Sequence, residues 1–361
     1  MPIAAILPQL VPVALSVYLH RFPLCRTLTR VNSVIGGSML VETLAQDTVT
    51  QFAIDVRLGL TKKGQKEIPS KYFYDEVGSA LFEVITVLPE YGLFRADERL
   101  LRENAETIAA MLPPGRVVVA ELGSGSGRKT SWMLEALATQ RPTVYHPIEI
   151  SRKALDQCSR ELGQLRNVEI RPVQQPYLQG LLSVAASRGS DERLLVLFLG
   201  STIGNFSWCA AERFLTEVRQ ALTAGDALLL SADLEKPPAQ LLPAYDDPLG
   251  VTASFNLNVL ARMNRELDAD FDLSAFRHLA RYHAAERRIE MHLVSTRPQS
   301  VAIPRAGCSV SFREGETIWT ESSHKYRRGE LMEIGRHAGF RALRQWLDGE
   351  WAFAQTLFVA E

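Results

Sequence analysis

The feature that most constrains the fold is an apolar strand followed by a glycine-rich loop and a helix. Residues 117–120 are an apolar, largely β-branched run, the loop Glu121–Thr130 places glycines at positions 123, 125 and 127, and residues 131–137 have helical spacing. This order is typical of the first unit of a nucleotide-binding α/β domain. Glycine has no Cβ, so the backbone can turn sharply and approach a ligand closely. A purely structural turn is the alternative that this loop alone leaves open.

The spacing of the glycines distinguishes between classes of nucleotide-binding loop. Dinucleotide-binding loops have G-x-G-x-x-G and P-loops have G-x-x-x-x-G-K-[ST]. This loop has G-x-G-x-G, with Glu121 two positions before the first glycine. The arrangement resembles the first motif of class I S-adenosylmethionine-dependent methyltransferases, which implies a loop that holds the amino-acid tail and ribose of that cofactor. An NAD-binding domain is the second interpretation at this point.

The composition argues against several other classes of protein. The 361 residues carry 40 lysines and arginines against 41 aspartates and glutamates, so the formal charge is −1, without the basic excess that nucleic-acid binding needs. The four cysteines form no C-x-x-C pair and the seven histidines no H-E-x-x-H pattern. We therefore expect free thiols in the reducing cytoplasm, no metal, and small-molecule partners. We also expect no membrane span, and we take a monomer as the working expectation.

Residues 1–38 differ from the rest of the chain. The segment Ala4–Tyr18 is apolar but contains Pro8 and Pro12, and three arginines follow it before the first acidic residue, Glu42. A basic, acid-poor start is typical of a targeting presequence. The alternative is a disordered or non-native extension before a natural start at Met39. We leave this extension out of the fold argument.

After the glycine loop, strands and helices alternate as in an open parallel sheet. Strands are predicted at 143–150, 168–173, 194–199 and 227–232, and the unbroken apolar run 194–199 suits a strand covered on both faces. Ligands in such sheets bind beyond the carboxyl ends of the strands. We therefore expect the glycine loop, Glu149, the segment 200–205 and Asp233 to lie along one edge of the sheet.

The regular alternation ends after Asp233. Residues 234–287 are predicted to be helical, 289–294 and 300–303 to form a hairpin, 316–326 to be a polar stretch, 328–338 a helix, and 340–347 with 353–360 a closing strand pair. Upstream, helices are predicted at 48–60, 79–88 and 96–111. This pattern predicts an α/β fold, namely a Rossmann-like class I methyltransferase core with an inserted α+β substrate-binding subdomain joined by N-terminal helices. The predicted boundaries are 39–111 for the helical part of the cover, 112–234 and 328–361 for the core, and 235–327 for the insertion.

Seven short blocks match one protein family in order and spacing. They are Tyr72–Ser79, Leu88–Tyr91, Glu121–Gly125, Leu197–Phe206, Gly250–Asn258, Arg288–Val294 and Thr320–Tyr326. Together they resemble the histidine Nα-methyltransferases, which make trimethylhistidine (hercynine) for ergothioneine biosynthesis. The resemblance covers residues 48–361, and seven blocks in order are more specific than any single motif.

The resemblance implies which residues bind the methyl donor S-adenosylmethionine and its product S-adenosylhomocysteine. Glu149, at the end of the second strand, would hold the ribose hydroxyls, where the family more often has aspartate. The implied cofactor-binding residues are Tyr74, Gly123, Gly125, Lys129, Glu149, Gln175, Tyr177 and Gly200.

The resemblance also implies a site for L-histidine. Asn205 and Tyr245 would hold its α-amino and carboxylate groups, and together with Tyr74 they form the implied catalytic set. Tyr91, Glu321 and Ser323 would bind the imidazole, and Thr252 and Met291 would shape the pocket. The implied substrate-binding residues are thus Tyr91, Asn205, Tyr245, Thr252, Met291, Glu321 and Ser323.

The chemistry of the proposed reaction suits such a site. Methyl transfer from a sulfonium is an in-line displacement, which needs a neutral amine held close to the methyl carbon. A glutamate, a serine and a tyrosine hydroxyl can together pair with both imidazole nitrogens. An amino acid without that ring would leave Glu321 buried and unpaired, so we expect specificity to rest on Glu321.

Two segments depart from the family pattern, and two alternatives stay open. Gly92–Phe94 replaces the usual Tyr-Pro-Thr near the expected substrate, which predicts altered loop order or affinity. Gln175 and Pro176 stand where an acidic residue usually meets the adenine, so we expect weaker cofactor binding, with Gln175 bonding the adenine amine. The alternatives are methylation of another amino acid, such as a tryptophan derivative, and a non-catalytic S-adenosylmethionine-binding protein.

Overall fold

The computed structural model describes residues 37–361, with side chains from Val49 onward, so the predictions for residues 1–36 lie outside the described residues. Contacts divide the chain into residues 1–47 and residues 48–361. All strands of the described part of the chain lie in the second unit, residues 48–361. In the described part of the chain, no single helix has the length and apolar character to cross a membrane. Helices α2 (Glu76–Val87) and α3 (Gly92–Met111) meet these two criteria only as a pair, which is bent by 72°.

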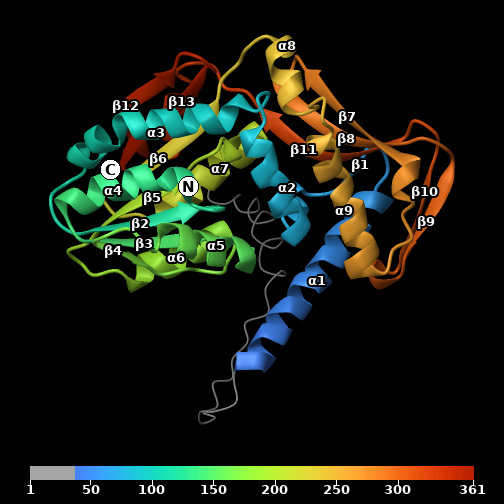
Figure 1. Cartoon of the computed structure of the whole chain (residues 1–361), viewed down its shortest axis with the longest axis horizontal. Coiled ribbons are helices and arrows are strands. Elements are labelled where there is room, and N and C mark those ends of the chain that lie inside the picture. The colour runs from blue at the N-terminus through green and yellow to red at the C-terminus, as the bar shows by residue number, and fades with distance from the viewer. Residues whose placement is uncertain (1–36) are drawn as a thin grey trace, which may run out of the picture. The chain divides into compact units, whose positions relative to one another are not determined.

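A seven-stranded sheet forms the larger part of this unit (Figure 1). Its order is β12-β13-β6-β5-β2-β3-β4, in which β2 to β6 run parallel and β13 runs antiparallel to both neighbours. The strands are β2 (Val117–Leu122), β3 (Thr143–Ile148), β4 (Val168–Ile170), β5 (Arg193–Phe198), β6 (Ala227–Asp233), β12 (Phe340–Asp348) and β13 (Phe353–Ala360). The predicted parallel sheet with a closing strand pair is confirmed.

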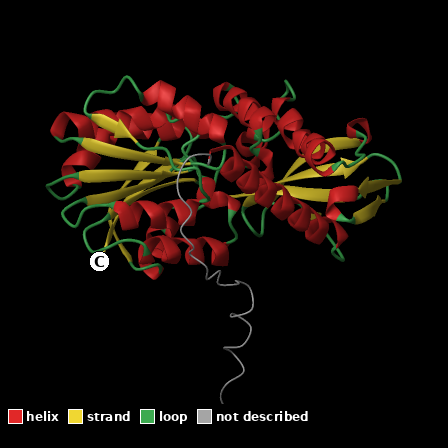
Figure 2. Cartoon of the chain, turned by 90° about the horizontal axis from the view of Figure 1, so that it is seen from below, coloured by secondary structure: helices red, strands yellow, loops and turns green. Residues whose placement is uncertain are grey.

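Helices cover both faces of this sheet (Figure 2). Val117 and Val119 of β2 pack with α3 (Gly92–Met111), α4 (Ser131–Gln140) and α5 (Arg152–Leu162). Val118 and Ala120 pack in a second core with α6 (Tyr177–Ser187), α7 (Trp208–Gln220) and α10 (Glu330–His337). Successive strand side chains point to opposite faces, so an unbroken apolar strand supplies both cores.

A second, four-stranded sheet has the order β1-β11-β8-β7. Its strands are β1 (Lys66–Glu67), β7 (Phe276–His283), β8 (Arg288–Ser295) and β11 (Thr317–His324), and β9 (Gln299–Ile303) pairs with β10 (Cys308–Phe312) as a separate hairpin. Helix α9 (Val251–Leu267) packs against β7 and β8, and α2 (Glu76–Val87) packs against α9. Helix α1 spans Gly37–Thr61, and α8 is a single turn at Pro238–Leu241.

Two predictions for this region are wrong, and a third segment has a structure that was not predicted. Residues 276–283 form β7 rather than helix, because β8 supplies a full set of backbone partners for them. Residues 289–294 and 300–303 do not pair with each other, since β8 lies between β7 and β11. The polar stretch 316–326 contains β11, whose polar side chains line a cavity. The predicted domain boundaries within residues 48–361 stay a prediction.

The two sheets are joined where β6 and β11 end. The Tyr326 N–H donates to the Asp233 carbonyl (3.0 Å), and the Glu235 N–H donates to the Tyr326 carbonyl (2.9 Å). A parallel bridge between Leu234 and Tyr326 lies at the same point. The end of a core strand therefore runs beside the end of the strand that carries the predicted acceptor residues.

Candidate active site

A cavity of about 980 Å³ lies beyond the carboxyl ends of β2, β3 and β5 and extends to β11. It brings together every predicted site residue except Gln175. Those lining it are Tyr74, Tyr91, Gly123, Gly125, Lys129, Glu149, Tyr177, Gly200, Asn205, Tyr245, Thr252, Met291, Glu321 and Ser323. Residues that are widely separated in the sequence thus line one cavity.

The glycine loop forms one wall of this cavity. Gly123, Gly125 and Gly127 all have positive φ, at 79°, 52° and 73°. A Cβ on Gly123 would lie 2.9 Å from Tyr177 Oη, and one on Gly127 would lie 2.7 Å from Cys158 Sγ. A Cβ on Gly125 would meet no protein atom within 4 Å. Packing therefore requires the outer two glycines, whereas the space beside the Gly125 Cα is open to a ligand.

Glu121 holds this loop from behind and does not line the cavity. The Thr130 hydroxyl donates to its two carboxylate oxygens at 2.8 and 2.9 Å, and the Tyr145 hydroxyl donates to Oε2 at 2.5 Å. Burial raises the pKa of Glu121 to about 7 against the effect of these hydrogen bonds. The acidic residue of the loop motif is therefore a structural support for the glycines.

Glu149 and Tyr177 suit an adenosyl group. The backbone N–H groups of Ile150 and Ser151 donate to Glu149 Oε1 at 2.8 and 3.2 Å, which orients a carboxylate at the end of β3 that can accept from a diol. Burial raises the pKa of Glu149, opposed by these backbone bonds. Tyr177, the first residue of α6, adds an aromatic side chain to the cavity wall. Together with the open space beside Gly125, these groups fit S-adenosylmethionine.

Gln175 does not line the cavity, although its neighbour Pro176 does. Its side-chain oxygen accepts a hydrogen bond from the Ser183 hydroxyl at 2.9 Å. The structure therefore ties this side chain to α6, and an adenine contact from Gln175 stays a prediction.

Sequence reasoning missed Asp97, which connects three parts of the cofactor side. Asp97 is fully buried; its Oδ2 accepts from Lys129 Nζ at 2.6 Å and from the Gly200 N–H at 2.8 Å. Its Oδ1 accepts from Gln355 Nε2 at 2.7 Å. Lys129 is thus a paired cation. The missed signal was an acidic residue on the apolar stripe of α3, where a buried carboxylate needs partners.

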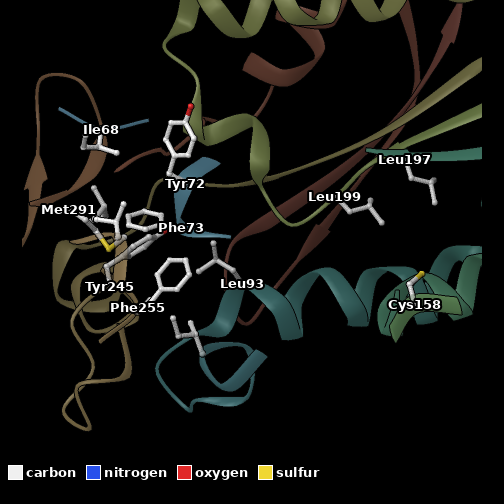
Figure 3. Close-up of a cluster of buried hydrophobic side chains, with 14 of the residues drawn as sticks. Ile68, Tyr72, Phe73, Leu93, Cys158, Leu197, Leu199, Tyr245, Phe255 and Met291 are labelled. Atoms are coloured by element: carbon white, nitrogen blue, oxygen red, sulfur yellow. The ribbon is translucent and has the colours of Figure 1, made fainter. Parts of the chain in front are cut away.

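Aromatic and other apolar side chains gather in a buried cluster that includes Tyr245, Phe255 and Met291 (Figure 3), and these three also line the cavity. The rings of Tyr91 and Tyr245 meet edge to face with centroids 6.5 Å apart. Burial raises the pKa values of Tyr74, Tyr91 and Tyr245 well above the ordinary value. All three phenols are therefore neutral hydroxyl groups at physiological pH.

A bulge in β11 directs Glu321 toward the cavity. Trp319 pairs with His292 and Glu321 with Met291, so Thr320 is an extra residue, and its hydroxyl donates to the Met291 carbonyl at 3.0 Å. Burial raises the pKa of Glu321 to about 7, and the Lys325 cation partly opposes this rise. Because side chains alternate along a strand, Glu321 and Ser323 share a face.

Ser323 and Tyr245 contact a buried lysine that sequence reasoning did not include in the site. Lys325 Nζ donates to Tyr245 Oη at 2.8 Å and to Ser323 Oγ at 2.9 Å. It also forms a 2.8 Å ion pair with Asp233 Oδ2, and Tyr245 donates to Ser323 Oγ at 2.8 Å. The sequence signal for Lys325 was its place in the last family-like block, which ends with Lys325-Tyr326.

The departure at Gly92 has a structural reason. A Cβ at Gly92 would lie 2.0 Å from Cε3 of Trp351, so Trp351 occupies the space that a side chain there would need. Gly92 also begins α3, earlier than the predicted start at residue 96. Arg95 donates to the Leu88 and Pro89 carbonyls at 2.7 and 2.6 Å, which fixes the preceding turn. The segment is therefore ordered helix.

The glycine loop after β2, the carboxylate at the end of β3 and the antiparallel edge pair define a class I S-adenosylmethionine-dependent methyltransferase. More narrowly, the chain belongs to the histidine-specific methyltransferases. The family model described as "Histidine-specific methyltransferase, SAM-dependent" matches residues 52–360. The predicted fold class, cofactor and family are confirmed.

The named relatives include methyltransferases of histidine and of a tryptophan derivative. The Histidine N-alpha-methyltransferase of Mycolicibacterium smegmatis is 39% identical over 324 residues, which cover 89% of this chain and 98% of that protein. Ergothioneine biosynthesis protein 1 of Neurospora crassa is 29% identical over 80% of this chain and 32% of its own length. A 4-dimethylallyltryptophan N-methyltransferase of Epichloe festucae var. lolii is 27% identical over 82% of this chain and 91% of its own.

Replacement of Asp97 tests the cofactor side. We expect Asp97→Ala to lower the free energy of unfolding by about 3–5 kcal/mol, because Lys129 loses its buried partner. We also expect it to weaken S-adenosylhomocysteine binding by at least about tenfold, since Lys129 and Gly200 lose a common anchor. Urea denaturation and calorimetry measure the two effects. Asp348→Ala is the control, because the 2.8 Å Arg99–Asp348 pair lies outside the cavity; equal cofactor affinity in both variants would contradict the assignment.

The raised pKa of Glu321 predicts a pH-dependent stability difference from Glu321→Gln. Between the ordinary pKa of 4.5 and about 7, the folded protein retains a proton that the unfolded chain releases. Stability therefore falls in this window as pH rises, by at most about 3 kcal/mol. We expect the free energy of unfolding of Glu321→Gln, relative to the parent, to increase from pH 4.5 to 7 and then level off. Urea denaturation at several pH values without ligand measures it, and a constant difference would refute the burial of a protonated carboxyl.

Proposed function

We propose that the protein transfers methyl groups from S-adenosylmethionine to the α-amino group of L-histidine, up to trimethylhistidine (hercynine), in ergothioneine biosynthesis. The family and the named relatives support this reaction. The observation that carries the proposal is one cavity with Gly125 and Glu149 at its donor end and Glu321 with Ser323 at its acceptor end.

The roles of the lining residues follow from their chemistry. Asn205, at the end of the turn Thr202–Asn205, offers an amide for the α-amino or carboxylate group of the substrate, and the Tyr245 hydroxyl offers a second contact. Glu321 and Ser323 bind the imidazole, with Tyr91 beside the ring. Thr252 and Met291 limit the size of the pocket.

The reaction needs a neutral amine and close alignment rather than a strong base. When bound, S-adenosylmethionine supplies an electrophilic methyl group on a sulfonium. A dehydrated pocket disfavours an ammonium ion and so lowers the pKa of the substrate amine. Tyr74, a neutral phenol in the cavity wall, can accept from the amine N–H and orient its lone pair. Such positioning can lower the activation barrier by about 7–11 kcal/mol.

The setting of the enzyme belongs to the same proposal. We infer a monomer in the cytoplasm that binds small molecules and neither nucleic acid nor membrane. The near balance of 40 basic and 41 acidic residues supports the exclusion of nucleic acid.

A product assay tests the reaction. The purified protein is incubated with S-adenosylmethionine and single amino acids, and the products are weighed by mass spectrometry. We expect histidine to gain one to three methyl groups. Methylation of a tryptophan derivative without any histidine product would replace the proposed substrate, and no product with any amino acid would favour a non-catalytic protein.

Replacement of Glu321 tests the acceptor site. We expect Glu321→Ala to lower kcat/KM for histidine by about 10- to 150-fold, the equivalent of one hydrogen bond to a charged group. Glu321→Gln keeps an acceptor oxygen and should lose less. Both variants should bind S-adenosylhomocysteine like the parent, because Glu321 lies at the other end of the cavity. Unchanged kinetics in Glu321→Ala would remove this residue from the site.

A further inference from the structure

Lys325 is a fully buried cation that no cofactor or substrate role explains. It directly follows β11, and it lies at the junction between the two sheets beside Asp233. A buried ammonium without partners is strongly unfavourable, and here it has three: the Asp233 carboxylate, Tyr245 Oη and Ser323 Oγ. Two of these partners line the cavity.

The contacts of Lys325 determine which way the Ser323 hydroxyl can act. A lysine ammonium only donates hydrogen bonds, whereas a serine hydroxyl has two acceptor lone pairs and one proton. Ser323 Oγ accepts from Lys325 Nζ at 2.9 Å and from the Tyr245 hydroxyl at 2.8 Å. Both lone pairs are then used. The hydroxyl proton is the one hydrogen-bonding group of Ser323 that is left for a ligand.

The acceptor end therefore presents groups of opposite character. Glu321, when ionised, only accepts, and Ser323 only donates. A neutral imidazole has one N–H and one bare nitrogen and satisfies both, whereas an imidazolium has two N–H groups and would set one against the Ser323 proton. The other titratable groups that face this position are Tyr74, Tyr91 and Tyr245, all neutral, with Asp233, Lys236 and Lys325 behind them.

We propose that Lys325, held by Asp233, is a positioning residue that commits Ser323 to donate, so that the site takes the neutral imidazole ring and rejects imidazolium. This inference rests on the proposed function, because it assumes that the ring of histidine lies between Glu321 and Ser323. It adds a residue pair outside the cavity wall that sets substrate charge selectivity. Lys325 acts through Ser323 and has no contact with the reacting atoms.

The test compares histidine with a triazole isostere, 1,2,4-triazol-3-yl-alanine, whose ring stays neutral over the same pH range. Calorimetry in the presence of S-adenosylhomocysteine gives the dissociation constant of each ligand from about pH 5 to 7.5. The quantity compared is the dissociation constant of histidine divided by that of the triazole. Ionisation of the substrate amine affects both ligands alike and cancels in the ratio. The same measurement on Glu321→Gln removes the titration of Glu321, whose pKa burial raises to about 7. In the parent protein, this ratio should rise about tenfold per pH unit below the imidazole pKa of about 6.5. In Lys325→Met it should rise less than about threefold, because Ser323 can then accept from an imidazolium.

Lys236→Met is the matched control. Lys236 is also buried and also pairs with Asp233, with Nζ to Oδ1 at 2.5 Å. Lys236 Nζ donates no hydrogen bond to Tyr245 or Ser323. Besides Asp233, it donates to the Leu234 carbonyl. We expect the ratio of dissociation constants in Lys236→Met to rise about tenfold per pH unit, as in the parent protein. Equal flattening in both lysine variants would overturn the proposal in favour of a general effect of buried charge.

Ser323→Ala tests the same idea without removing a buried charge, so it decides the matter if Lys325→Met fails to fold. This variant removes the hydroxyl donor, so the pH dependence of the ratio should weaken as much as in Lys325→Met. A parent slope retained in either Ser323→Ala or folded Lys325→Met would overturn the role of Lys325 while the proposed function stands. A parent protein that binds neither ligand would instead refute the proposed function, and this inference with it.

Discussion

The junction between β6 and β11 is the interaction on which the rest of the site depends. Asp233 is buried between Lys325 and Lys236, and backbone bonds at Tyr326 hold the two strand ends side by side. Burial lowers the pKa of Lys236 to about 8, although the adjacent Asp233 opposes this. Breaking such a pair would leave an unpaired buried charge, so separation of the two strand ends is energetically unfavourable. The junction therefore fixes the distance between the sheet that carries the glycine loop and the sheet that carries Glu321 and Ser323.

Two buried glutamates illustrate how similar electrostatics serve different purposes. Burial raises the pKa of both Glu121 and Glu321 to about 7. Glu121 accepts from the hydroxyl groups of Thr130, shared between its two oxygens, and of Tyr145, and these bonds hold the glycine loop. For Glu321, burial and the Lys325 charge alone shift the pKa, and no protein hydrogen bond contributes. A carboxylate that the protein leaves unpaired in a cavity is available to a ligand, and this difference separates a structural acid from a binding one.

The sequence predicted the parts of the site that depend on local pattern. The glycine spacing, the acidic residue after the second strand and the order of the family-like blocks all lead to residues that the cavity brings together. It could not predict Asp97 or the contact of Gly92 with Trp351, because each depends on a partner more than 30 residues away. β11 was missed for a related reason. Its polar side chains line a cavity, so the usual contrast between an apolar face and a solvent face is lost.

The groups proposed to bind the acceptor lie together on β11, an inner strand of the second sheet. Glu321 and Ser323 share one face of β11, and Lys325 continues it into the junction with Asp233. A side chain without hydrogen-bonding groups would leave both the carboxylate and the serine proton unpaired in a dehydrated pocket, at a cost of several kcal/mol. To accept such a substrate, the site would have to replace Glu321 and Ser323 and also find new partners for Lys325. Since Lys325 and Asp233 neutralise each other in the junction, a change of substrate class would reach beyond the cavity wall into the contact that holds the two sheets together.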